Sequence, residues 1–207
     1  MNDAEVTPDG RAVVFGTKDV RFADPIAALY LFTVADRRLT ELAGGQTCSN
    51  GKVIHPHPAG GFTLFDIDTP RRVVTRYALD VEKRTLTEAG IAIDLRAEPG
   101  FPDGMVDCGD GTVVIAYYNP APEPAGRAVR YRLDTGAAVE EWRTPGSPRV
   151  TCPLLVKRPD GVKLVLTTAV EGMPADQRAA CPNAGCLFLA DTGLTAVPPV
   201  VSVRLGG

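Results

Sequence analysis

The feature that most constrains the fold is a repeat of about fifty residues. A glycine turn followed by a run of β-branched and aromatic residues occurs four times along the chain. The turn glycines, which are 51, 50 and 50 residues apart, are Gly10, Gly61, Gly111 and Gly161. Behind each turn, apolar and polar residues alternate around a short polar turn, which is the pattern of an exposed antiparallel hairpin. The chain of 207 residues therefore contains about four copies of one unit.

Each copy predicts four strands, which in the first copy are residues 3–7, 12–16, 28–34 and 38–43. Four strands in about fifty residues are typical of a β-propeller blade. The sequence thus predicts an all-β protein, a β-propeller with about four four-stranded blades, in which residues 1–207 form a single domain. A β-helical solenoid has shorter repeats and an immunoglobulin-like sandwich has no such period, so both are less favoured. Trp142 is expected to pack between blades.

Composition excludes several classes of protein. The apolar stretches are short and interrupted by glycine, proline or charge, so none is long enough to cross a bilayer. The formal net charge of -3, without any basic stripe, argues against a nucleic-acid partner. Five cysteines at irregular spacings do not resemble a secreted disulfide framework, and the N-terminus lacks the pattern of a signal peptide. These features predict reduced thiols in a cytoplasmic protein.

Oxygen-bearing side chains recur at the start of each innermost strand. In a propeller these strands line the central channel, so equivalent starts meet at one mouth of the channel. The starts are Asn2–Asp3, Asn50, Asp103 and Thr151–Cys152. A carboxylate together with carboxamides suits a hard divalent cation such as Ca²⁺. The alternative is that Asp103, in a predicted Pro102-Asp103-Gly104 turn, and Asn50, before Gly51, only make ordinary turns.

Five segments of the sequence also resemble the motifs of a known protein family. They are "MNDAEVTPDGRAVVFGT", "CSNGKVI", "DIDTPRRVVTRYALD", "GFPDGMVD" and "GMPADQRAACPNAGCLFLAD", and they extend over essentially the whole chain. In order and spacing they resemble the R-x-N-D-G, S-N-G, D-T-x-x-x-x-I, P-D-G-M-x-x-D and P-x-A-G-x-L-F motifs of the senescence marker protein, regucalcin and gluconolactonase family. That family consists of metal-dependent sugar lactonases.

The resemblance implies a six-bladed propeller of which this chain lacks about the first two blades. Carried over by motif, Asn50 and Asp103 would be metal ligands, and Asn2 would contact the substrate. The implied cofactor is a divalent metal, Ca²⁺ before Zn²⁺, Mn²⁺ or Mg²⁺. Two departures are visible: the family's glutamate ligand has no counterpart here, and Lys52 follows S-N-G where the family is usually apolar.

The function implied by the resemblance is hydrolysis of a small sugar-type lactone by metal-activated water. The catalytic general base would be Asp103 or a neighbouring carboxylate that does not bind the metal. No G-x-S-x-G motif is present, so a covalent serine route is not favoured. The alternative is a non-catalytic metal- or ligand-binding propeller, or an inactive truncated member of the family. The sequence predicts no membrane or nucleic-acid partner and leaves the oligomeric state open.

Overall fold

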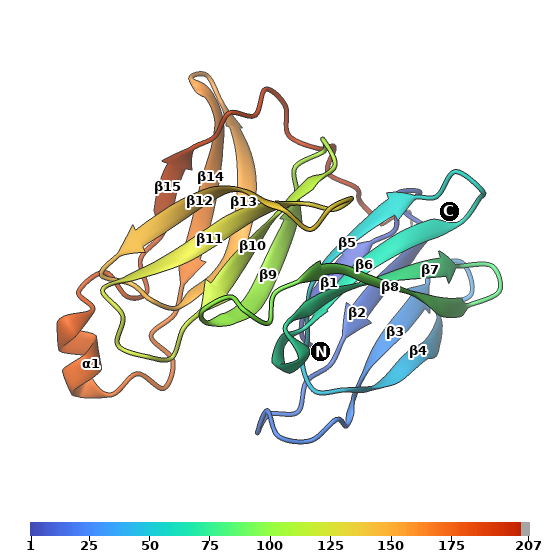
Figure 1. The fold of residues 1–207 in the computed structure, drawn as a ribbon. Helices are drawn as coiled ribbons and strands as arrows, with labels where there is room; N and C mark the ends of the chain where they lie inside the picture. Colours follow the sequence, from blue (N-terminus) through green and yellow to red (C-terminus); the bar gives the residue numbers. More distant parts are fainter. Residues whose placement is uncertain (204–207) are drawn as a thin grey trace. The chain divides into compact units, whose positions relative to one another are not determined.

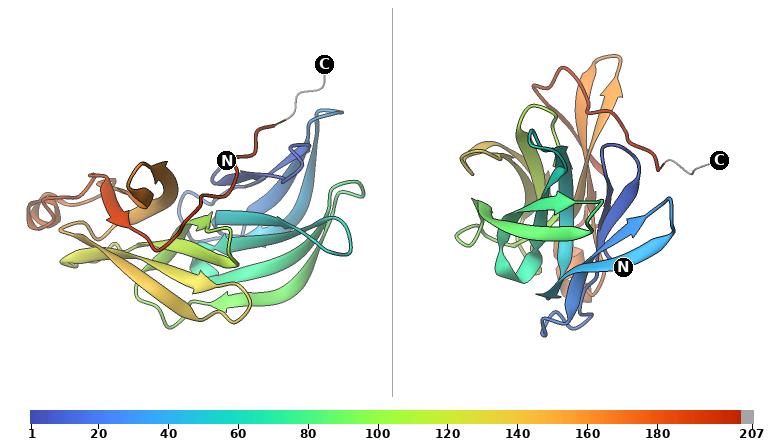
Figure 2. Two further views of the ribbon diagram at one scale, coloured as in Figure 1. Left: turned by 90° about the horizontal axis from the view of Figure 1, so that it is seen from above. Right: turned by 90° about the vertical axis from the view of Figure 1, so that its right-hand side faces the viewer.

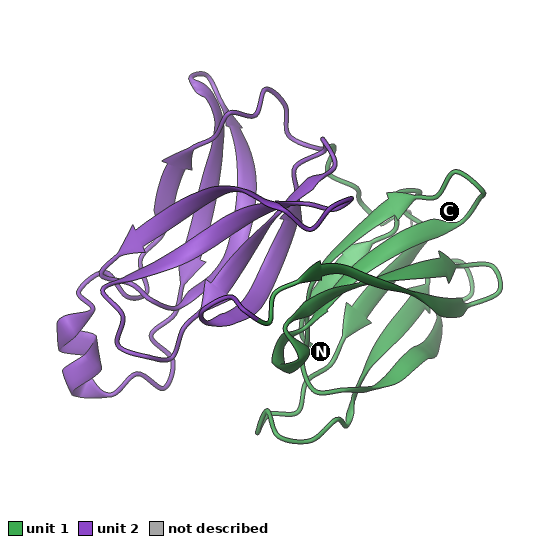
Figure 3. Cartoon of the chain, in the orientation of Figure 1, with its two compact units in different colours: residues 1–96, 199–207 green, residues 97–198 purple. Residues whose placement is uncertain are grey.

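The structure, a computed structural model, describes residues 1–203. The described chain is nearly all β-strand (Figure 1) and divides into two compact units (Figure 3). Unit 1 contains residues 1–96 and the described part of 199–207, and unit 2 contains residues 97–198. The prediction that residues 1–207 form a single domain stays a prediction. Within residues 1–203, no helix has both the length and the apolar character needed to cross a membrane.

Unit 1 contains two antiparallel four-stranded sheets, each with its strands in sequence order (Figures 1 and 2). The first consists of β1 (Ala4–Val6), β2 (Ala12–Gly16), β3 (Ala27–Thr33) and β4 (Arg38–Gln46). The second consists of β5 (Ser49–Pro56), β6 (Phe62–Asp68), β7 (Val73–Asp80) and β8 (Thr85–Asp94), with the 3-10 helix η1 (Thr69–Arg71) after β6. Both sheets contribute to one core, in which Leu31 and Leu64 are fully buried.

Unit 2 contains one four-stranded and one three-stranded sheet, both antiparallel. The first consists of β9 (Phe101–Asp107), β10 (Thr112–Tyr118), β11 (Ala125–Arg132) and β12 (Ala138–Pro145). The second consists of β13 (Val150–Arg158), β14 (Gly161–Thr168) and β15 (Phe188–Asp191), with the helix α1 (Ala175–Ala180) before β15. Trp142 packs in the core that the two sheets share, and its Nε1 donates to the Asp191 carbonyl oxygen over 2.9 Å. The prediction for Trp142 is confirmed.

The predicted strand pattern is confirmed, with one difference in the last copy. The four strands expected in the first copy form within a few residues of their predicted bounds. In the last copy the expected hairpin gives only β15, and residues 192–203 form no strand. The segment after β15 contains Pro198 and Pro199, which have no N–H to donate to a ladder. Leu194 and Val197 instead pack against the core of unit 2.

The glycine turns of the repeat are confirmed, whereas the turn predicted at Pro102-Asp103-Gly104 is wrong. The four repeat glycines have φ between 73° and 123°, the left-handed region that glycine tolerates best. Asp103 and Gly104 lie inside β9, and Gly104 is not among the residues with positive φ. The five cysteines are free thiols, three of them buried, and the two exposed ones are Cys152 and Cys186.

Candidate functional site

The first strand of three sheets contains a β-bulge near its beginning. In β9, Pro102 is paired with Tyr117, and the next pair is Met105 with Ile115, so two residues of β9 oppose one residue of β10. The pairing register of β5 with β6 shifts between Ser49 and Lys52, and that of β13 with β14 shifts between Val150 and Pro153. The bulged pairs are Asn50–Gly51, Asp103–Gly104 and Thr151–Cys152. Bulges re-aim side chains and are common beside active sites, so Asp103 is presented by a bulge and not by a turn.

The beginning of β1 has the same arrangement. The backbone nitrogen of Asn2 donates to the Gly16 carbonyl oxygen over 2.7 Å, and the nitrogen of Gly16 donates to the Asp3 carbonyl oxygen over 3.0 Å. Asn2 and Asp3 therefore both oppose Gly16. The positions that the fifty-residue repeat aligns are thus equivalent in the strand pairing of their four sheets.

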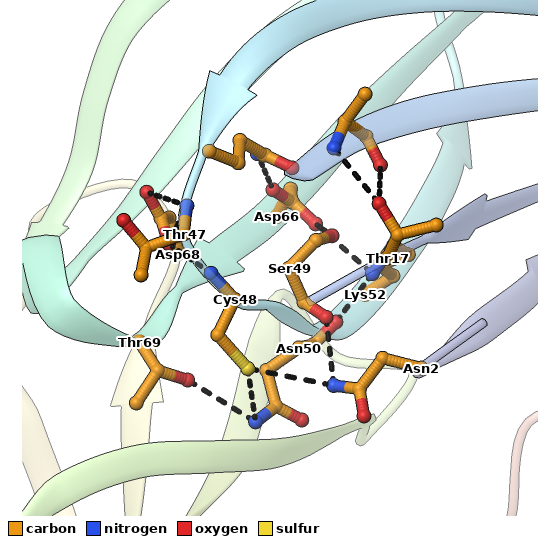
Figure 4. A network of polar contacts seen from close by, with 12 residues as sticks. Asn2, Thr17, Thr47, Cys48, Ser49, Asn50, Lys52, Asp66, Asp68 and Thr69 are labelled. Atoms are coloured by element: carbon orange, nitrogen blue, oxygen red, sulfur yellow. Dashed lines mark hydrogen bonds and ion pairs between the residues drawn. The ribbon is translucent and has the colours of Figure 1, made fainter. Parts of the chain in front are cut away.

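In unit 1, hydrogen bonds fix the side-chain amides of Asn2 and Asn50 by their nitrogen atoms (Figure 4). The Asn2 Nδ2 donates to the Ser49 carbonyl oxygen over 2.8 Å, and this oxygen can only accept. The Asn50 Nδ2 donates to Thr69 Oγ1 over 3.1 Å, and both amides also approach the Cys48 Sγ. Each amide therefore has its oxygen end turned away from these bonds. Amide oxygens are ligands that Ca²⁺ accepts, so these residues fit a hard cation.

A buried carboxylate of β6 holds the segment that precedes Asn50. Asp68 Oδ1 accepts a hydrogen bond from the Cys48 backbone nitrogen over 2.9 Å and another from Thr47 over 3.2 Å. Burial raises the pKa of Asp68, and these two N–H donors oppose that rise. Asp68 thus fixes the backbone from which the bulge of β5 begins.

In unit 2, the bulge of β9 packs closely against the bulge of β13. A Cβ atom placed on Gly104 would lie 2.7 Å from the Thr151 carbonyl oxygen and 2.9 Å from the Cys152 Cα. Glycine is therefore required after Asp103 for a close approach of two backbones. The hydroxyls of Thr151 and Thr167 are hydrogen-bonded over 2.6 Å, so hydroxyl groups also lie at the bulge of β13.

The structure thus brings two of the three predicted site residues together, and the third lies in the other unit. Asn2 and Asn50 belong to unit 1, where Cys48 and Ser49 connect them, and Asp103 belongs to unit 2. Among residues 1–203, no group of three or more His, Cys, Asp or Glu side chains has the arrangement of a metal centre. The predicted donor set has a different composition, one carboxylate with carboxamides. Its roles in catalysis and binding stay a prediction.

The β2–β3 connection is hydrogen-bonded to the segment of unit 1 that precedes Asn50. Its Asp19 carboxylate predicts how the stability of the protein depends on pH. The Asp19 nitrogen donates to the Thr47 carbonyl oxygen over 2.8 Å. The Asp19 carboxylate accepts from the backbone nitrogens of Asp24, Ala23 and Arg21, and these bonds lower its pKa from 3.8 to about 2. Because the folded pKa is depressed, the stabilisation is complete above pH 3.8 and disappears as the pH falls through about 2.

We therefore expect Asp19→Asn to lower the melting temperature at neutral pH and to have progressively less effect toward pH 2. Thermal unfolding of both proteins across this range measures the difference. Asp176→Asn, at an exposed aspartate in the first turn of α1, serves as the control. If the melting temperature of Asp19→Asn were lower than that of the unmodified chain by the same amount at every pH, this role for the carboxylate would be contradicted.

Comparison with known proteins supports the resemblance seen in the sequence. The model of the SMP-30/Gluconolactonase/LRE-like region matches residues 1–170. Regucalcin of Danio rerio is 28% identical over 137 residues, which are 66% of this chain and 44% of that protein. The 6-deoxy-6-sulfogluconolactonase of Pseudomonas putida is 28% identical over 188 residues, 91% of this chain and 60% of that protein.

A solved structure gives the fold. The crystal structure of regucalcin from Agrobacterium tumefaciens, a calcium-binding protein, superposes with a TM-score of 0.75 at 25% identity, covering 98% of this chain and 64% of that one. The predicted β-propeller with about four blades is confirmed by this match. The chain spans about half of the Danio rerio protein and less than two thirds of the other two. With a family model that matches 170 of its 207 residues, the chain belongs to the SMP-30/gluconolactonase/LRE-like family.

Proposed function

We propose that this chain hydrolyses a sugar-type lactone with the help of a divalent cation, and that Asn50 and Asp103 are each metal ligands. Membership of a family with gluconolactonases supports the reaction class. The observation that carries the site is the recurrence of the bulge, which puts an oxygen-bearing side chain at the same register in β5 and β9. Ca²⁺ is the favoured ion, because the donors are a carboxylate and an amide oxygen and no thiolate or imidazole is among them.

When bound, a divalent cation would polarise the lactone carbonyl and lower the pKa of a nearby water molecule. The Asp103 carboxylate removes a proton from the attacking water as its oxygen adds to the carbonyl carbon. The bond between this carbon and the ring oxygen then breaks, and the proton passes to the ring oxygen, which leaves a hydroxy acid. The amide oxygen of Asn2 accepts a hydrogen bond from a sugar hydroxyl, because its nitrogen is already bonded to the Ser49 carbonyl.

A hydrolysis assay of the purified chain tests this function. The chain is freed of metal with EDTA and incubated with aldonolactones, with and without Ca²⁺, Zn²⁺, Mn²⁺ or Mg²⁺. We expect hydrolysis above the spontaneous rate only with added metal, and highest with Ca²⁺. Hydrolysis at full rate without metal would contradict the cation site. Calorimetric binding of Ca²⁺ without turnover would instead favour the non-catalytic propeller.

A further inference from the structure

A buried ion pair lies next to Asn50 and has no part in the proposed reaction. The ammonium of Lys52 in β5 lies 3.1 Å from Asp66 Oδ1 in β6, and the two side chains are 0% and 1% exposed. Replacing a buried ion pair by apolar side chains of similar volume is often neutral or stabilising, because desolvation offsets the attraction. Stability alone therefore does not account for Lys52 and Asp66.

The ammonium of Lys52 also donates to the backbone carbonyl oxygen of Asn50 over 2.5 Å. At the bulge the pairing passes from Ser49 directly to Lys52, so the ladder to β6 skips Asn50 and Gly51. A buried backbone carbonyl needs a hydrogen-bond donor, and Lys52 supplies one from within the same strand. Lys52 thus fixes the backbone of the residue that carries the proposed ligand (Figure 4).

Asp66 is itself held by neighbouring side chains. Its Oδ2 accepts from Gln46 Nε2 over 2.7 Å, and its Oδ1 accepts from Ser49 Oγ over 3.0 Å. A Cβ atom on Gly16 would lie 2.1 Å from Ser49 Oγ and 3.1 Å from the Lys52 ammonium, so the glycine leaves room for these groups. Gln46 Oε1 is buried without a hydrogen-bond partner among residues 1–203, but the other bonds join Gln46, Ser49, Lys52 and Asp66 into one connected network. A connected polar network orients its members.

We propose that Lys52 and Asp66 are positioning residues that hold the bulge of β5 so that the Asn50 amide oxygen is presented to the cation. The inference rests on the proposed function, since it takes Asn50 to be a ligand. Asn2 is bonded to the Ser49 carbonyl in the same segment, so the network also orders the proposed substrate contact.

The test uses the double variant Lys52→Met/Asp66→Leu in the full chain. The single variant Lys52→Met would leave Asp66 buried without its cation and is expected to fold poorly. In the double variant both charges are gone, so we expect a folded protein, with a melting temperature lowered by the lost hydrogen bonds of the Asn50 carbonyl, Ser49 and Gln46. Loss of residues that orient metal ligands commonly weakens metal binding about 10- to 100-fold, and we expect a change of that size in the Ca²⁺ affinity measured by calorimetry.

A core substitution in the same unit, Ile93→Val, is the control, because Ile93 is buried in β8 and takes no part in the network. It should lower the melting temperature slightly and leave the Ca²⁺ affinity unchanged. A readout without metal is the side-chain amide signal of Asn50 in an NMR spectrum, which should shift or broaden in the double variant and not in Ile93→Val.

The outcomes separate the two proposals. Absence of Ca²⁺ binding by the unmodified chain overturns the cation site and the inference with it. Equal Ca²⁺ affinity of the unmodified chain and the folded double variant overturns the inference alone, and an unchanged Asn50 amide signal does the same without metal.

Discussion

Replacement of Asp103 by asparagine is expected to lower kcat for metal-dependent lactone hydrolysis by about 10²–10⁴-fold, the usual contribution of a general base. Asparagine has nearly the same shape as aspartate, so the bulge of β9 should persist. Its amide is neutral and does not take a proton from water, and it is also a weaker ligand for a divalent cation than a carboxylate. The variant should therefore lose both turnover and Ca²⁺ affinity, which kinetics and calorimetry measure separately.

The control for this substitution is Asp134→Asn, the same chemical change elsewhere in unit 2. Asp134 lies in the β11–β12 turn, is 59% exposed and pairs with Arg132. Exposed ion pairs contribute little to stability, so this variant should behave as the unmodified chain. If Asp103→Asn were as active as Asp134→Asn and the unmodified chain, Asp103 would have no role in the reaction.

The fold could be predicted from the sequence because one period governs the whole chain. The left-handed glycines Gly10, Gly61, Gly111 and Gly161 recur with the strands that follow them, and a repeat of this length with four strands matches few architectures. The missing fourth strand of the last sheet was harder to foresee. "GLTAVPPV" alternates like a strand, and only its prolines and the packing of Leu194 and Val197 show that it is not one.

The candidate site was predicted only in part. Period and motif selected Asn2, Asn50 and Asp103, but Asp103-Gly104 has the same letters whether it forms a turn or a bulge. The difference depends on β13, whose backbone approaches Gly104. The pairing of Lys52 with Asp66 was missed, because it depends on the register of β5 against β6. The available signal was that a lysine and an aspartate each interrupt an apolar strand pattern.

Replacement of Gly104 by alanine is expected to destabilise unit 2 by about 1–3 kcal/mol, as overpacking of a well-packed interior commonly does. The added Cβ would meet the Thr151 carbonyl oxygen at 2.7 Å and the Cys152 Cα at 2.9 Å. Both are backbone atoms, which cannot turn aside as a long side chain can. The strands β9 and β13 must therefore separate at their bulges, and Asp103 moves with β9.

Denaturant unfolding, monitored by tryptophan fluorescence, measures the destabilisation of unit 2 by Gly104→Ala. The chain has one tryptophan, Trp142, and it is buried in the core of unit 2. The matched control is Gly193→Ala, where an added Cβ meets nothing within 4 Å and φ is not positive. We expect Gly193→Ala to leave the unfolding midpoint unchanged or raise it slightly, since alanine restricts the unfolded chain. Equal unfolding midpoints for the two alanine variants would show that β9 and β13 do not approach closely at Gly104. Close packing of the two strands would then not explain why a glycine follows Asp103.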